Sequence, residues 1–276
     1  SFFKCYLLKH FKIIIIFYVF SFLVGILIMF YLLRGKTKKY HYDEFPFPSA
    51  NTKAHQQSLK KGELFMGLIR PKYIKDNIIE IGCGTGRVLK MLEMAGKRKL
   101  VGVDISESSL NTAKRELKFS KLMRCDATNL SQFKDNTFDT IICHGVAHHT
   151  KYPKKVLNEA IRIGKPKGII LFSHYRKNSY YYWDYLIVQH LIKFIYFYHF
   201  QHILSPLFRT YIYFLRGSFP SKDEAIRLIA DRYVSPIIKF TTETDLFLSC
   251  IENNTEIEKF KLSSRKSLMN FWIKKC

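Results

Sequence analysis

Residues 78–173 alternate between short apolar runs and longer stretches that mix apolar and polar positions. The apolar runs end in turns or carboxylates and predict buried β-strands over residues 78–81, 99–104, 121–126, 138–143 and 168–173. The stretches between them predict helices over residues 87–95, 107–118 and 153–163, with Ser106 as the N-cap of the second. Strands that alternate with helices predict an α/β fold, in which a mostly parallel sheet carries helices on both faces.

The first strand leads into a glycine-rich turn, Glu80-Ile-Gly-Cys-Gly-Thr-Gly86. Its glycines allow a sharp turn and a close approach of the backbone to a ligand. The dinucleotide fingerprint G-x-G-x-x-G is not present, because Arg87 occupies the position of its last glycine. The second strand ends at Asp104, near the position where nucleotide-binding α/β folds place an acidic residue on a ribose.

An acidic residue followed by G-x-G-x-G resembles motif I of the class I S-adenosylmethionine-dependent methyltransferases, especially the ubiquinone/menaquinone-type small-molecule enzymes. The stretches 138–149 and 161–168 resemble the fourth-strand segment and the following helix-to-strand turn of that group. The resemblance covers residues 75–175 and, more weakly, 241–275. It implies a Rossmann-like, doubly wound, mostly parallel seven-stranded sheet, with a late helix from Thr241 and a helical substrate-lid insertion at 176–240 after strand 5.

The same resemblance implies S-adenosyl-L-methionine as the cofactor and a set of residues that bind it. Asp104 would hold the ribose hydroxyls, and Asp126 with Ala127 would border the adenine. His148 and His149 are the candidates for acceptor contact or general base, because they follow the fourth strand. The expected cofactor-binding set is Glu80, Gly82, Cys83, Gly84, Thr85, Gly86, Asp104, Ile105, Asp126, Ala127 and His144.

The N-terminal part of the chain has a different character. Residues 13–33 form a 21-residue run without a charge, long enough for a helix to span a bilayer, after a short flank at 1–12. A polar linker at 34–54 follows, and its basic start favours a cytosolic position for the domain at 55–276. The sequence therefore predicts a single-pass membrane protein with its catalytic domain on the cytosolic side.

Composition narrows the function further. The net charge is +23, but the basic residues are spread along the chain, which disfavours a dedicated nucleic-acid surface. The six cysteines contain no C-x-x-C pair and predict reduced thiols, and the histidines lack a metal-ligand spacing. We expect methyl transfer to a small, apolar or lipid-like acceptor. A nucleic-acid or protein methyltransferase, and a non-catalytic cofactor-binding membrane protein, stay open as alternatives, and the oligomeric state is not predicted.

Overall fold

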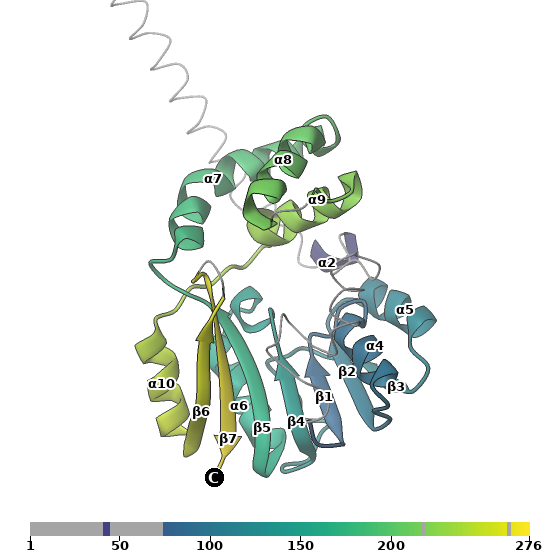
Figure 1. Cartoon of the computed structure of the whole chain (residues 1–276), viewed down its shortest axis with the longest axis vertical. Coiled ribbons are helices and arrows are strands. Elements are labelled where there is room, and N and C mark those ends of the chain that lie inside the picture. The colour runs from purple at the N-terminus through teal and green to yellow at the C-terminus, as the bar shows by residue number, and fades with distance from the viewer. Residues whose placement is uncertain (1–40, 45–73, 217–218, 264–265) are drawn as a thin grey trace, which may run out of the picture.

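The computed structural model describes residues 41–44, 74–216, 219–263 and 266–276. Its centre is a seven-stranded sheet with helices on both faces (Figure 1). A further group of helices lies beyond the edge formed by the carboxyl ends of the parallel strands. The strands lie in the order β3-β2-β1-β4-β5-β7-β6. Their bounds are β1 Ile78–Ile81, β2 Leu100–Asp104, β3 Ser120–Arg124, β4 Phe138–Cys143, β5 Gly164–Tyr175, β6 Thr255–Leu262 and β7 Leu268–Lys275.

The helices divide between the two faces of the sheet. Apolar residues of α4 (Arg87–Met94) and α5 (Glu107–Glu116) form one buried cluster with one face of the strands. Those of α6 (Pro153–Ile163) and α10 (Glu243–Glu252) form a second cluster with the other face. All four residues of β1 are buried, and its alternate side chains enter the two clusters. This is the doubly wound arrangement that the alternation of elements predicts.

The expectation of a mostly parallel sheet needs correction, because the sheet is mixed. The strands β1 to β5 pair in parallel, but β7 runs antiparallel to both β5 and β6. The physical reason is the short connection between β6 and β7, which leaves no room for a crossover and reverses the chain as a hairpin does.

Strand β5 also begins earlier than the apolar run at 168–173 indicates. Its pairing with β4 shifts from Gly164 to Ile169, so that residues 165–168 bulge out of the ladder. Lys167 in this bulge has φ +59°, and a Cβ on Gly168 would lie 2.7 Å from the Lys165 carbonyl oxygen. The expected helix-to-strand turn is therefore present as a bulge inside the strand.

The chain between β5 and α10 is helical and has its own core. It contains α7 (Tyr180–Phe197), η3 (Phe200–His202), α8 (Ser205–Arg216), α9 (Lys222–Ile229) and the π-helical η4 (Ala230–Val234). A third buried cluster, rich in tyrosine, joins these helices. They lie beyond the edge where β5 ends (Figure 1). The helical insertion after strand 5 is confirmed, and its role as a lid stays a prediction.

Two helix starts follow the chemistry expected from the sequence. The Ser106 hydroxyl caps α5 by accepting a hydrogen bond from the Ser109 amide. Thr242 and Asp245 form a reciprocal capping box at the start of α10, where the sequence has a threonine and an acidic first turn.

The proposed anchor at 13–33 lies outside the described residues, as do its flank at 1–12 and most of the linker. Of that linker the structure describes the short helix α2 (His41–Glu44). None of the helices in the described ranges has the length and apolarity needed to cross a membrane.

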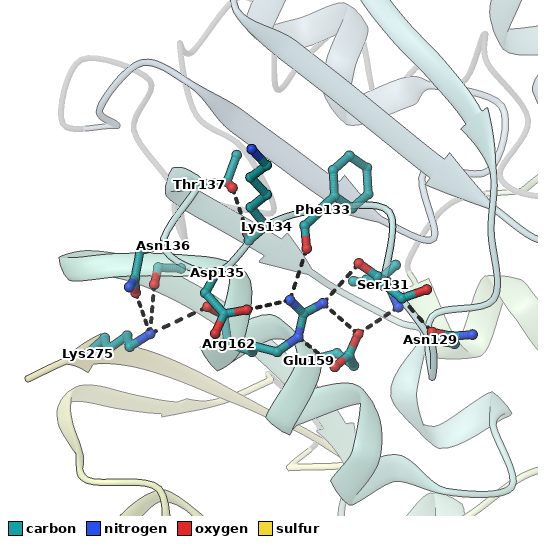
Figure 2. A network of polar contacts seen from close by, with 12 residues as sticks. Asn129, Ser131, Phe133, Lys134, Asp135, Asn136, Thr137, Glu159, Arg162 and Lys275 are labelled. Atoms are coloured by element: carbon teal, nitrogen blue, oxygen red, sulfur yellow. Dashed lines mark hydrogen bonds and ion pairs between the residues drawn. The ribbon is translucent and has the colours of Figure 1, made fainter.

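A polar network fastens the loop between β3 and β4 to helix α6 (Figure 2). Arg162 donates to the carbonyl oxygens of Leu130 and Phe133, both at 2.9 Å, and to the Asp135 carboxylate at 2.7 Å. Its guanidinium also pairs with Glu159, which accepts the Leu130 amide as well. These bonds raise the pKa of Arg162 and lower that of Glu159.

Replacement of Arg162 by Lys is expected to lower the free energy of unfolding by about 2 kcal/mol. A lysine ammonium cannot reproduce the planar fork that serves four partners, so loop carbonyls lose their donors. Urea unfolding measures the effect. Lys154→Met is the matched control, because Lys154 lies on the surface of the same helix, α6. Its ammonium makes one exposed ion pair, 4.0 Å from Glu252 of α10. Its effect should stay within about 0.5 kcal/mol, and equal effects of the two changes would contradict the role given to Arg162.

Candidate active site

The carboxyl ends of β1 and β4 lie side by side at the point where the strand order reverses. From β1 the order continues to β2 and β3 on one side, and from β4 to β5 on the other. Ligands of open α/β sheets bind beyond this switch point, because the chains that leave the two strands diverge there. The candidate site is therefore built on the turn after β1 and the segment after β4.

The glycine turn after β1 has the backbone that its sequence predicts. Gly82, Gly84 and Gly86 have φ values of +72°, +53° and +80°, in the left-handed region where other residues are strained. A Cβ on Gly82 would lie 2.2 Å from Val146 Cγ2, so this position has no space for a side chain. Helix α4 begins directly after Gly86 without a side-chain cap, and its positive dipole end faces the same edge.

Asp104 joins the glycine turn to the end of β2. Its Oδ2 accepts the Gly84 amide at 2.7 Å, and its Oδ1 accepts the Ser106 amide at 2.9 Å. Burial raises the pKa of Asp104, and these backbone hydrogen bonds oppose the rise. Helix α2 reaches the same place, since Asp43 accepts hydrogen bonds from the Ser106 hydroxyl and the Ser108 amide. The structure thus gives Asp104 a structural task beside the ribose contact expected of it.

Glu80 is the acidic residue in front of the turn. Its side chain is buried, and burial raises its pKa, while the nearby Arg87 and a hydrogen bond from the Leu89 amide act in the opposite direction. Its Oε2 has no hydrogen-bond partner among the described residues. Buried polar atoms are almost always paired, so an unpaired carboxylate oxygen at this edge fits a site that receives a ligand donor.

The other expected cofactor residues share this edge of the sheet. Asp126 is exposed and accepts the amide and the hydroxyl of Thr128, both at 2.8 Å. Ile105 is exposed although it is apolar, as suits a side chain that covers a base. Cys83 and Thr85 are buried within the turn, and Ala127 is half-buried after β3. The roles assigned to these residues stay predictions.

Burial disfavours the protonated form of three histidines beside this edge. It lowers the pKa of His144 to about 3, with a further contribution from Arg87, and that of His174 to about 4. The pKa of His148 is also lowered, first by burial and then by the neighbouring imidazoles. Neither ring nitrogen of His148 finds a hydrogen-bond partner within the described parts of the chain, and its ring stacks on Tyr175 with centroids 3.6 Å apart.

His149 has a different environment, which is built from three segments of the chain. Its Nδ1 lies 3.1 Å from the Ile237 carbonyl oxygen and 3.0 Å from the Ser235 hydroxyl. Its Nε2 lies 3.8 Å from Asp231 Oδ1, and the Tyr42 hydroxyl of α2 donates to the same oxygen at 3.0 Å. Burial lowers the pKa of His149, and the Asp231 charge partly opposes this.

This arrangement selects His149 over His148 as the candidate general base. The Ile237 carbonyl can only accept, so a neutral His149 carries its proton on Nδ1 and leaves Nε2 free to accept another. If Nε2 took up a proton, the Asp231 carboxylate 3.8 Å away would stabilise the imidazolium. Asp231, Ser235 and Tyr42 were not identified from the sequence, because no local motif marks them and their contacts span 82 to 189 residues.

The comparisons with known proteins agree with the fold. Residues 79–172 match the family described as Methyltransferase domain. The chain is 23% identical over 175 residues to a ubiquinone biosynthesis O-methyltransferase of Neisseria meningitidis serogroup A, covering 57% of this chain and 74% of that protein. It is 28% identical over 119 residues to the thiol S-methyltransferase TMT1B of Mus musculus, covering 41% and 49%.

Solved structures share the fold. A possible histamine N-methyltransferase of Thermotoga maritima aligns with a TM-score of 0.51 at 16% identity, covering 86% of this chain and 92% of that one. Magnesium protoporphyrin IX methyltransferase of Synechocystis, solved with bound SAH, aligns with a TM-score of 0.50 at 15% identity, covering 86% and 93%. The chain belongs to the class I S-adenosylmethionine-dependent methyltransferases. It is an enzyme of this class, and its cofactor is S-adenosylmethionine.

The residues at the switch point fit this cofactor. The glycine turn, the unpaired Glu80 oxygen and the Asp104 carboxylate would hold its amino-acid and ribose parts. Its sulfonium supplies an activated methyl group with a good leaving group. The protein must therefore bring a nucleophile into line with that methyl group and accept a proton where the nucleophile has one.

Proposed function

We propose that this protein is a membrane-anchored methyltransferase that acts from the cytosolic side on a small, apolar or lipid-like acceptor. His149 serves as the general base where the acceptor is a hydroxyl or a thiol. The names of the relatives support a small-molecule acceptor, since they describe O-methylation in ubiquinone biosynthesis and S-methylation of thiols.

The observation that carries the apolar acceptor is the aromatic wall around the histidines. Tyr175 stacks on His148 and also on Phe240, the latter at 5.8 Å between ring centroids. Tyr181 of α7 packs edge-on against both Tyr175 and Phe240. A polar acceptor would lose its hydration beside these rings without gaining partners, whereas an apolar acceptor gains from burial.

The proposed anchor rests on residues 13–33, which carry no charge, and on the basic residues that follow. The positive-inside rule favours the cytosolic side for those basic residues and, with them, for the domain. Cytosolic S-adenosylmethionine would then reach the glycine turn directly.

The test is a methylation assay with the full chain in phospholipid vesicles and methyl-labelled cofactor. Alkylphenols and alkanethiols of increasing chain length serve as acceptors, and Asp104→Ala, whose cofactor binding should be weakened, serves as the low-activity control. We expect kcat/KM to rise with length, by up to about fourfold for each methylene buried. Carbonate extraction should leave the chain in the membrane fraction. Turnover confined to peptides, nucleic acids or polar acceptors would contradict the proposed acceptor, and release by carbonate would contradict the anchor.

A further inference from the structure

Helix α7 exposes an unusual set of side chains. Its exposed residues are all large and apolar: Tyr180, Trp183, Leu186, Ile187, Leu191 and Phe197. Ile187 is 78% exposed and Trp183 is 55% exposed. The opposite side of the helix packs into the insertion core through Tyr181, Tyr185, Ile192 and Ile195. Since one side is already packed, the apolar outer side is a surface and not a second core.

The apolar surface continues along the chain. Ile203 after η3 is 73% exposed, and Leu207 and Phe214 of α8 are exposed to a similar extent. Arg209 is the one exposed charged residue between 180 and 214 among those whose side chains are described. The neighbouring helix α9 does not share this property, because it exposes Lys222 and Asp223. The uniformly apolar exposed set is that of α7, while η3 and α8 add large apolar side chains among the exposed His202, Arg209 and Thr210.

We propose that the outer side of α7, with the η3–α8 segment that follows, is a membrane-binding face that lies in the interfacial region of a phospholipid bilayer. We define this membrane-binding face by Trp183, Ile187, Leu191, Ile203, Leu207 and Phe214. A helix with one apolar side and one packed side lies on a bilayer rather than across it. Tryptophan and tyrosine are the side chains that favour the headgroup level.

A bilayer is favoured over a protein partner because few residues separate the uncharged N-terminal run from α2. The uncharged run ends at residue 33, and α2 begins at residue 41. Eight residues can reach at most about 28 Å. The Tyr42 hydroxyl of α2 is bonded to Asp231 of the insertion. This inference rests on the proposed anchor, because a run that spans the bilayer holds the insertion within that distance of the lipid surface.

This placement deepens the proposed function. The packed side of α7 carries Tyr181, which contacts Tyr175, and Tyr175 stacks on the His148 ring. One helix therefore separates the proposed lipid contact from the histidines. An acceptor dissolved in the bilayer would enter beside α7 and would not have to cross water.

The two tryptophans of the chain provide a direct test. Trp183 lies on the membrane-binding face, whereas Trp272 lies on β7 within the sheet, with the Lys259 ammonium 5.0 Å from its ring. The full chain carrying Trp272→Phe reports Trp183 alone, and the full chain carrying Trp183→Phe reports Trp272 alone. Each is mixed with vesicles of phosphatidylcholine and phosphatidylglycerol whose acyl chains carry bromine, a short-range quencher.

We expect brominated lipid to remove more than half of the Trp183 fluorescence and to leave that of Trp272 nearly unchanged. Iodide in the aqueous phase should quench Trp183 less when vesicles are present. The same fluorescence with brominated and ordinary lipid would overturn the proposal, whether or not the chain is anchored. Carbonate extraction of the same samples reports on the anchor separately, so that failure of the anchor and failure of the membrane-binding face are distinguished.

Discussion

Asp104→Ala is expected to weaken cofactor binding by roughly ten- to a hundredfold. The ribose hydroxyls would lose a charged acceptor, and such hydrogen bonds contribute about 1.5–3 kcal/mol. The structure adds a second cause, because the same carboxylate holds the Gly84 amide at 2.7 Å and so fixes the glycine turn. Titration calorimetry with S-adenosylhomocysteine measures the change.

Two comparisons separate these causes. A cofactor analogue without ribose hydroxyls should bind the wild-type chain more weakly, yet it should bind the Asp104→Ala chain as well as the parent compound does. Asp139→Ala is the matched control, since Asp139 lies at the start of β4 and pairs with Lys165 at 3.0 Å, far along the strand from the switch point. An Asp104→Ala chain that still distinguishes the two ligands would show that the ribose is bound elsewhere.

The parts of the fold that the sequence predicts are those in which local pattern and tertiary packing agree. The run at 78–81 is apolar apart from Glu80 because both faces of β1 are buried, and helix α6 occupies the predicted residues 153–163. The glycine turn was predictable because its left-handed φ values require that residue type. The early start of β5 was not, because Gly164 and Lys165 look like a turn and the four-residue bulge depends on pairing with β4.

The candidate site, like the fold, has one part that the sequence predicts and one part that it does not. Its cofactor half contains the continuous glycine motif at 80–86, so the resemblance to a known family locates it. Its acceptor half depends on contacts between distant segments, and Asp231 lies in a π-helical stretch whose sequence carries no periodic signal. Reading along the chain therefore finds the histidines after β4 but not the carboxylate that distinguishes His149 from His148.

His149→Gln is expected to lower kcat by roughly a hundred- to ten-thousandfold, the usual contribution of a general base, while cofactor affinity stays unchanged. Glutamine can still donate a hydrogen bond to the Ile237 carbonyl, so the loop after β4 keeps its main contact. The deficit should shrink as the acceptor becomes more acidic, because an ionised phenol or thiol needs no base. Stopped assays with a series of substituted phenols and thiols measure this trend, and an equal loss for every acceptor would contradict the role of base.

The pH dependence supplies a second readout. Burial lowers the pKa of His149, so its neutral form persists at pH values below the usual pKa of a histidine. The acidic limb of kcat/KM should therefore lie below about pH 6.5.

Asp231→Asn removes the charge that favours the imidazolium. The other titratable side chains around the His149 ring are those of His148, Tyr175 and Tyr42. In their neutral forms they do not replace the negative charge that Asp231→Asn removes. The pKa of His149 should then fall further and move the acidic limb to lower pH, with a smaller loss of kcat than in His149→Gln. Tyr42→Phe keeps the carboxylate and should move that limb much less. An acidic limb at the same pH in wild type and Asp231→Asn would remove Asp231 from the reaction and leave it a structural contact between the insertion and the sheet.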